Sequence, residues 1–114
     1  MDTQALARRI VELAEDKQAV DIVLLDLRSL RTFADYFIIC TGESDRQLKA
    51  ILDAVDEGVA QEFGLETKSE GQTESGWVLL DYSDVVVHIF SKEMREFYKL
   101  EKLWSEAVPL VVVQ

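Results

Sequence analysis

Apolar residues recur with the period of an α-helix in two stretches of the chain. In the first stretch, Leu6, Ile10, Leu13 and Ala14 fall on one face, while the positions between them are mostly polar. This spacing predicts an amphipathic helix over about residues 3–17.

The second helical stretch is marked at both ends. Ser44 and Gln47 form a Ser-x-x-Gln capping pattern at its start, and Gly64 is a typical stop signal. Gly58 lies inside the stretch, which indicates close packing at that point. One apolar stripe connects the two ends: Leu48, Ile51, Leu52, Val55, Val59 and Phe63.

Short apolar runs between these helices predict strands. Residues 22–25 are bounded by acidic residues, and residues 35–41 are rich in aromatic and β-branched side chains, with Gly42 ending the run. A further short strand is expected over residues 65–68. Residues 69–76 are polar and contain two glycines, which is typical of a loop.

A β-hairpin is the strongest local prediction. Two apolar runs, Trp77–Tyr82 and Val85–Phe90, flank the turn-forming pair Ser83 and Asp84. A two-residue loop places Trp77 opposite Phe90, so side-chain alternation defines two faces. The aliphatic face, expected in the core, holds Val78, Leu80, Tyr82, Val85, Val87 and Ile89. The mixed face, expected to recognise a partner, holds Trp77, Leu79, Asp81, Val86, His88 and Phe90.

The segment after the hairpin combines aromatic residues with alternating charges. Helical pieces are expected over about residues 92–105, with Pro109 stopping them. At helical spacing, four residues share a face that would pack on the sheet: Phe97, Leu100, Leu103 and Trp104. Tyr98 fits an interface or the core equally well, and the core is favoured for Trp104. Residues 110–113 form an apolar tail with no assigned role.

The order of these elements predicts an α/β fold, a single domain over residues 1–114 with a mixed β-sheet flanked by helices. The sheet would lie in two or three layers with its helices. Its parallel part is expected to come from the crossover through residues 44–63.

Charge narrows the choice of partner. The 114 residues carry a net charge of −10, which repels nucleic-acid phosphates and favours a basic protein. Nine acidic residues and one basic residue lie between positions 53 and 84. The single cysteine fits a reducing compartment, and no apolar run reaches the length of a membrane span, so a cytoplasmic location is expected.

Candidate chemistry is sparse, so we expect no enzyme, no catalytic residue, no cofactor and no metal site. Cys40 is expected to be a buried small side chain, and a Cys–His pair would need the fold to bring it to His88. Asp81 lies diagonal to His88 and could orient it by a hydrogen bond. A nucleotidyltransferase would need a pair of metal-binding acids on a strand, and the sequence has none at that spacing. Gly42 fits a strand-to-helix turn better than a phosphate loop.

Several of these segments together resemble the ribosomal silencing factor family, also called RsfS or Iojap-like, over roughly residues 5–107. The segments that carry the resemblance are residues 19–26, Asp35-Tyr36-Phe37-Ile38, Ser44-x-x-Gln47, Gly76-Trp77, the run from Asp81 to Phe90, and Arg95-x-x-Tyr98-x-Leu100-Glu101-x-Leu103-Trp104. Ser83 departs from the glycine that is common in the family's hairpin turn.

The resemblance implies a nucleotidyltransferase-like fold without the active site and a non-enzymatic role. Such factors bind the fourteenth protein of the large ribosomal subunit, block joining of the subunits when nutrients are scarce, and are often dimeric when free. Little direct nucleic-acid contact and no membrane contact are expected. The partner-binding residues expected here are Trp77, Asp81, His88, Phe90, Tyr98, Glu101 and Lys102. A large-subunit assembly factor using the same surface is the first alternative, and a nucleotidyltransferase-like enzyme the second.

Overall fold

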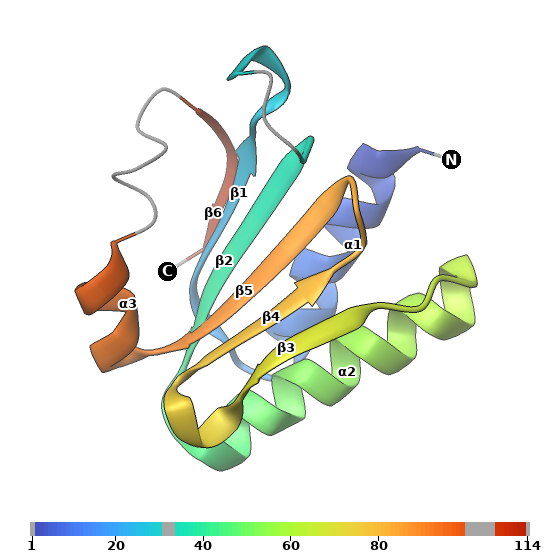
Figure 1. The fold of residues 1–114 in the computed structure, drawn as a ribbon. Coiled ribbons are helices and arrows are strands. Elements are labelled where there is room, and N and C mark those ends of the chain that lie inside the picture. The colour runs from blue at the N-terminus through green and yellow to red at the C-terminus, as the bar shows by residue number, and fades with distance from the viewer. Residues whose placement is uncertain (1, 31–33, 100–106, 114) are drawn as a thin grey trace.

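The computed structural model describes residues 2–30, 34–99 and 107–113, with the side chains of residues 68–70 and 72 excepted. Three α-helices and six β-strands alternate along these residues (Figure 1). The elements, in chain order, are α1 (Thr3–Asp16), β1 (Val20–Asp26), β2 (Tyr36–Gly42), α2 (Asp45–Phe63), β3 (Lys68–Gln72), β4 (Trp77–Asp81), β5 (Val85–Ser91), α3 (Lys92–Tyr98) and β6 (Val108–Val113).

The strands form one mixed sheet in the order β3-β4-β5-β2-β1-β6. β2 and β5 pair in parallel, and every other neighbouring pair is antiparallel. This arrangement confirms the predicted α/β class and its mixed sheet. The parallel pair is reached from β2 through α2, as predicted, although the chain then passes through β3 and β4 before it enters β5 (Figure 1).

α1 and α2 cover one face of the sheet and form the larger core with it (Figure 1). Arg9 on α1 makes a two-pronged ion pair with Glu62 on α2, with contacts of 2.8 and 3.0 Å. A Cβ atom at Gly58 would lie 2.7 Å from Cδ1 of Leu13, which confirms the close packing that this glycine predicts.

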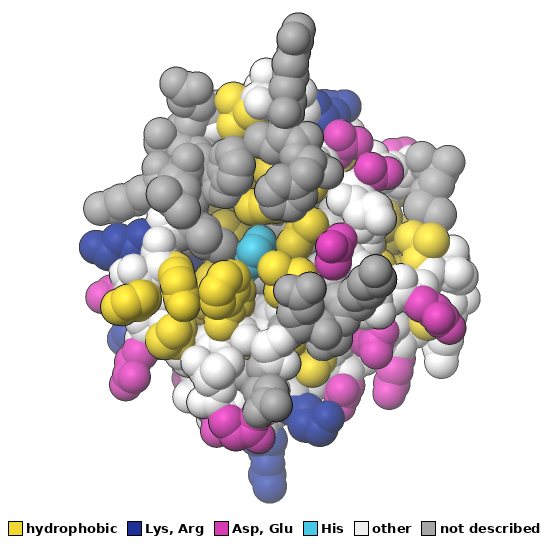
Figure 2. All heavy atoms as spheres, in the orientation of Figure 1, with side chains coloured by type: hydrophobic (Ala, Val, Ile, Leu, Met, Phe, Trp, Pro, Cys, Tyr) yellow, Lys and Arg dark blue, Asp and Glu magenta, His cyan; other side chains and the backbone are white. Residues whose placement is uncertain are grey.

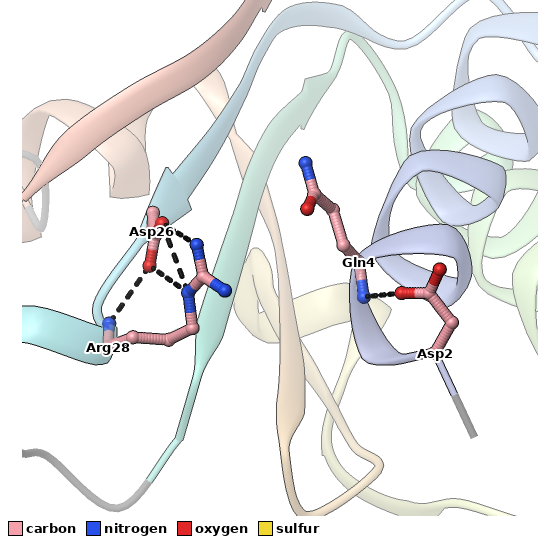
Figure 3. A network of polar contacts seen from close by, with 4 residues as sticks. All are labelled: Asp2, Gln4, Asp26 and Arg28. Atoms are coloured by element: carbon pink, nitrogen blue, oxygen red, sulfur yellow. Dashed lines mark hydrogen bonds and ion pairs between the residues drawn. The ribbon is translucent and has the colours of Figure 1, made fainter.

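Side-chain contacts fix several element ends. Asp2 caps α1 by accepting the backbone N–H of Gln4 at 3.0 Å, and Arg28 grips the carboxylate of Asp26 where β1 ends (Figure 3). Ser44 caps α2 as predicted, accepting the N–H of Gln47 at 3.1 Å. The Gln47 side chain accepts the N–H of Glu43 instead of closing the capping box on Ser44 itself.

Gln47 also has a second task that its capping pattern does not reveal. Its amide donates to the carbonyls of Lys17, at 3.2 Å, and Gln18, at 2.9 Å, in the turn after α1. One side chain therefore ties the start of α2 to the end of α1.

The hairpin of β4 and β5 has the predicted register. Trp77 pairs with Phe90, Leu79 with His88, and Asp81 with Val86. Every residue of the predicted aliphatic face is buried in the core shared with α1 and α2, which confirms that face: Val78, Leu80, Tyr82, Val85, Val87 and Ile89.

The prediction for residues 65–76 was wrong. The strand does not occupy residues 65–68; β3 begins at Lys68 and runs to Gln72, through the first half of the expected loop. Its sequence, Lys-Ser-Glu-Gly-Gln, lacks the apolar and β-branched residues that predict strands. An edge strand pairs with one neighbour through its backbone and needs no apolar pattern, which explains the error.

The end of the chain also differs from its prediction. Within the described residues α3 ends at Tyr98, with Lys99 in a left-handed conformation, and residues 100–106 lie outside the description. Pro109 lies inside a strand, because β6 takes up the apolar tail as the edge strand beside β1. An edge position suits proline, because its backbone nitrogen has no hydrogen to donate to a neighbouring strand.

The hairpin turn is strained at Ser83, whose φ is 71°. The N–H of Asp84 donates to the carbonyl of Tyr82 at 2.9 Å, which closes a three-residue γ-turn centred on Ser83. Left-handed φ values are costly for residues that carry a Cβ and easy for glycine.

We therefore expect Ser83→Gly to raise the free energy of unfolding by about 0.5–1 kcal/mol, because the relief of strain exceeds the extra entropy of glycine in the unfolded chain. Urea denaturation at pH 7 measures the change. Ser83→Ala is the control, since alanine keeps the Cβ and should bring no gain. Equal midpoints for the two variants would contradict the assignment of strain.

Candidate functional site

An aromatic cluster occupies the face of the sheet opposite α1 and α2. Trp77 begins β4, and its indole stacks on Phe90 at 5.4 Å between ring centroids and lies 4.6 Å from the ring of Tyr98 on α3. Phe97 meets Tyr98 edge to face at 5.1 Å. Figure 2 shows hydrophobic side chains gathered on this face beside the histidine.

A shallow groove of about 300 Å³ runs across the cluster. Among the residues that the structure describes, its lining consists of Gly71, Ser75, Trp77, Leu79, Met94 and Tyr98, and none of these side chains is charged. A groove of this volume is at the lower limit for small-molecule pockets. We call these six residues the aromatic groove.

Gly76 explains why α3 can lie so close to Trp77. Its φ is 79°, and a Cβ there would come within 2.6 Å of Oγ of Ser91 and 2.7 Å of Cγ of Met94. The N–H of Ser91 also donates to the carbonyl of Gly76 at 2.8 Å. The Gly76-Trp77 pair noticed in the sequence therefore joins the hairpin to the first turn of α3.

Arg95 fastens α3 from its other side. The guanidinium donates to the hydroxyl of Thr41 at 2.9 Å and to the carbonyl of Asp21. That carbonyl is turned out of β1 by an irregularity in the ladder between Val20 and Val23, where Asp21 has a φ of 50°. The contact holds α3 on the ends of β1 and β2, and so holds Met94 and Tyr98 beside Trp77.

The expected site residues divide into exposed and buried members. Asp81 is exposed, Tyr98 is 37% exposed, and Trp77 is partly buried. Phe90 and His88 are buried, with 0% and 5% of their surface exposed. The expectation that Phe90 anchors a partner directly does not fit this burial, because Trp77 and Tyr98 stack over its ring. Glu101 and Lys102 lie outside the described residues.

Phe97 was expected to pack on the sheet, and this prediction was wrong. The side chain is 76% exposed, and α3 ends one residue later, at Tyr98. The other members of the expected apolar face, Leu100, Leu103 and Trp104, lie outside the described residues. Phe97 thus extends the aromatic groove outward, and sequence reasoning missed it as a surface residue.

His88 has a different partner from the one its position suggested. Its Nδ1 accepts the indole N–H of Trp77 at 3.3 Å, whereas the carboxylate of Asp81 accepts the backbone N–H of Ser83 at 2.7 Å. The Asp81–His88 hydrogen bond that the sequence allowed does not form. Burial lowers the pKa of His88 to about 4, so the imidazole is neutral at pH 7.

Cys40 is fully buried, as expected, and burial raises the pKa of its thiol to about 12. β2 and β5 are neighbours, but Cys40 packs in the core with α1 and α2 while His88 stacks against Phe37 and Phe90 on the other face. The fold therefore does not bring the two side chains together as a nucleophilic pair.

Neither a metal cluster nor a membrane-spanning helix was found in the part of the chain that the structure describes: three or more His, Cys, Asp or Glu side chains do not converge there, and its helices are too short or too polar to cross a bilayer. The turn at Gly42 leads into the Ser44 cap, as expected from the sequence.

Comparison with known proteins gives a consistent result. A curated protein of Halalkalibacterium halodurans named ribosomal silencing factor RsfS is 44% identical, over 94% of this chain and 92% of its own length. A Mus musculus protein named mitochondrial assembly of ribosomal large subunit protein 1 is 31% identical over 84% of this chain, which spans 43% of that longer protein. A crystal structure from Chromobacterium violaceum superposes with a TM-score of 0.86 at 36% identity, covering 92% of this chain and 88% of that one.

The family model described as "Ribosomal silencing factor during starvation" matches residues 1–114. The match covers the hairpin, α3 and β6, so it includes every residue of the aromatic groove as well as the helices that support the sheet. The resemblance seen in the sequence is thereby confirmed, and this chain belongs to the ribosomal silencing factor family, RsfS.

Proposed function

We propose that this protein is a translational repressor that binds the large ribosomal subunit through its fourteenth protein and sterically blocks joining of the small subunit. The observation that carries the proposal is the aromatic groove, whose described lining is uncharged, on a chain with a net charge of −10 in a family named for ribosomal silencing. Nutrient limitation is the condition in which such repression lowers translation.

The surface combines two features that suit a basic protein partner. Trp77 and Tyr98 are large, partly exposed aromatic side chains, which are common anchors of protein interfaces. Asp81 lies on the same face of β4, four residues or about 13 Å along the strand from Trp77, and its charge is exposed. An apolar anchor with an acidic residue beside it fits a lysine- or arginine-rich surface.

Two expected contact residues take a supporting part in this proposal. His88 and Phe90 lie beneath Trp77 and shape the floor of the surface. Glu101 and Lys102 remain proposed contacts on the strength of the sequence alone. We also propose that the protein is cytoplasmic and has no enzymatic activity. It would be dimeric when free and would make little contact with ribosomal RNA.

A role in large-subunit assembly is the second candidate. The name of the Mus musculus relative refers to assembly of the large ribosomal subunit. The same surface could bind an immature subunit and hold its docking face closed until maturation ends. Depletion of the protein separates the two roles: immature particles accumulate under the assembly role, whereas subunits mature normally under the repressor role.

Occlusion predicts that the order of addition decides the outcome. Protein added to purified free subunits should reduce the joined ribosomes in proportion to the occupied large subunits. Protein added after joining should have little effect, because its binding face is then covered. Sedimentation in a sucrose gradient measures both cases, and rapid splitting of ribosomes that are already joined would reject simple occlusion.

Truncation on the two faces of the hairpin should have opposite effects. Trp77→Ala should weaken binding to large subunits by about 2 kcal/mol or more, as expected for a central aromatic anchor. Val87→Ala, in the core behind the same sheet, should lower the free energy of unfolding by roughly 1–3 kcal/mol and leave binding by the folded protein unchanged. A similar loss of binding in both folded variants would argue against the aromatic groove.

The negative charge of Asp81 should raise the rate at which the protein associates with the large subunit. Asp81→Lys should slow binding to large subunits several-fold, most clearly at low salt, because steering between opposite charges is screened over about 8–10 Å at physiological ionic strength. Asp81→Asn separates charge from structure, since its amide oxygen can still accept the N–H of Ser83. Glu57→Lys, on the exposed face of α2, is the matched control. Equal rates for the two Lys variants would place the partner elsewhere.

A further inference from the structure

The indole N–H of Trp77 points into the protein. It donates to Nδ1 of His88 at 3.3 Å across the hairpin, and the two rings lie 6.1 Å apart at an interplanar angle of 27°. Because Nδ1 is the acceptor, the proton of the neutral imidazole resides on Nε2. The hydrogen bond therefore defines both the tautomer of His88 and the orientation of Trp77.

The acceptor is held firmly in place. His88 is 5% exposed, and its ring lies 4.8 Å from the ring of Phe37 and stacks on Phe90 at 6.1 Å with an interplanar angle of 7°. Aromatic neighbours restrict rotation of the imidazole, and its pKa of about 4 keeps Nδ1 unprotonated at neutral pH. The hydrogen bond that fixes Trp77 is therefore present at neutral pH.

Stability alone does not account for a histidine at this position. Nε2 of His88 is buried and has no hydrogen-bond partner among the residues that the structure describes, a state that costs free energy and requires an explanation. A phenylalanine would fill the same space among Phe37, Phe90 and Trp77 and would remove the unpaired Nε2. What phenylalanine cannot do is accept the indole N–H.

The hydrogen bond to His88 changes which groups of Trp77 can contact a partner. A tryptophan at an interface usually offers its N–H as a hydrogen-bond donor to the partner, but here the N–H already donates to His88 inside the protein. The hydroxyl of Ser75 is also engaged, donating to the carbonyl of Trp77 at 3.3 Å. In the described lining, the side chains of Trp77, Leu79 and Met94 therefore present apolar atoms to the groove.

We propose that His88 is a positioning residue that fixes Trp77, and that the groove so formed accepts an aliphatic side chain of the basic partner protein. This inference rests on the proposed function. The uncharged lining and the volume of about 300 Å³ fit an aliphatic group, and the net charge of −10 favours basic residues around it.

The test compares His88→Phe, which keeps the ring and removes the acceptor, with His88→Asn, whose short side chain can place an oxygen near the position of Nδ1. The indole N–H signal of Trp77, identified by its absence in Trp77→Phe, should shift and exchange faster with water in His88→Phe. The free energy of unfolding should change little, because removal of the unpaired Nε2 offsets the lost hydrogen bond. Its affinity for purified large subunits should fall about ten-fold, the scale of one lost hydrogen bond, and His88→Asn should recover most of it.

Two outcomes for the single variant His88→Phe would overturn the positioning role. One is an indole signal that is unchanged in His88→Phe, and the other is a freed indole with wild-type affinity. In a Trp77→Phe background, His88→Phe should bring no further loss of binding. An equal loss in both backgrounds would mean that His88 touches the partner itself, which also overturns the role.

The groove's occupant is tested at Leu79. Leu79→Met should bind large subunits like the wild type, while Leu79→Asn should bind about ten-fold more weakly, because it places an amide in an apolar contact. Full affinity of Leu79→Asn would exclude an aliphatic occupant. If the wild-type protein does not bind large subunits at all, the proposed function fails, and the indole signals still decide whether His88 fixes Trp77.

Discussion

Side-chain alternation along β5 is the constraint on which the rest of the structure depends. β5 lies inside the sheet, between β4 and β2, and six of its seven residues are buried. Val85, Val87 and Ile89 enter the core with α1 and α2, while His88 and Phe90 support the aromatic cluster on the other face. A slip of one residue would place an imidazole in the aliphatic core and a row of valines under Trp77.

That constraint explains how much of the molecule could be predicted from its sequence. The hairpin register followed from a two-residue loop and a period of two, and α2 followed from its cap, its stripe and Gly64. These signals are local, so they survive without knowledge of the fold. β3 has no such signal, because the pairing that forms it belongs to the backbone of β4.

The location of the candidate site could be predicted from the sequence, but the burial of its residues could not. The sequence placed Trp77, His88 and Phe90 on one face, and the structure agrees. Burial of Phe90 depends in part on α3, whose Tyr98 lies over its ring, and Arg95 holds α3 on that face by donating to Thr41 and to the carbonyl of Asp21. These partners are 54 and 74 positions away in the sequence, and nothing in the local pattern of residues 92–98 indicates them.

The position of β6 has a consequence for the order in which the molecule can assemble. β6 is the last strand in the chain, yet it pairs with β1, the first. Until residues 108–113 have been synthesised, β1 has an open edge, whereas the hairpin, α2 and the β2–β5 pair already have their partners. Contacts between distant parts of a chain form slowly. A nascent chain on the ribosome can therefore build its aromatic face before residues 108–113 close the edge of its sheet.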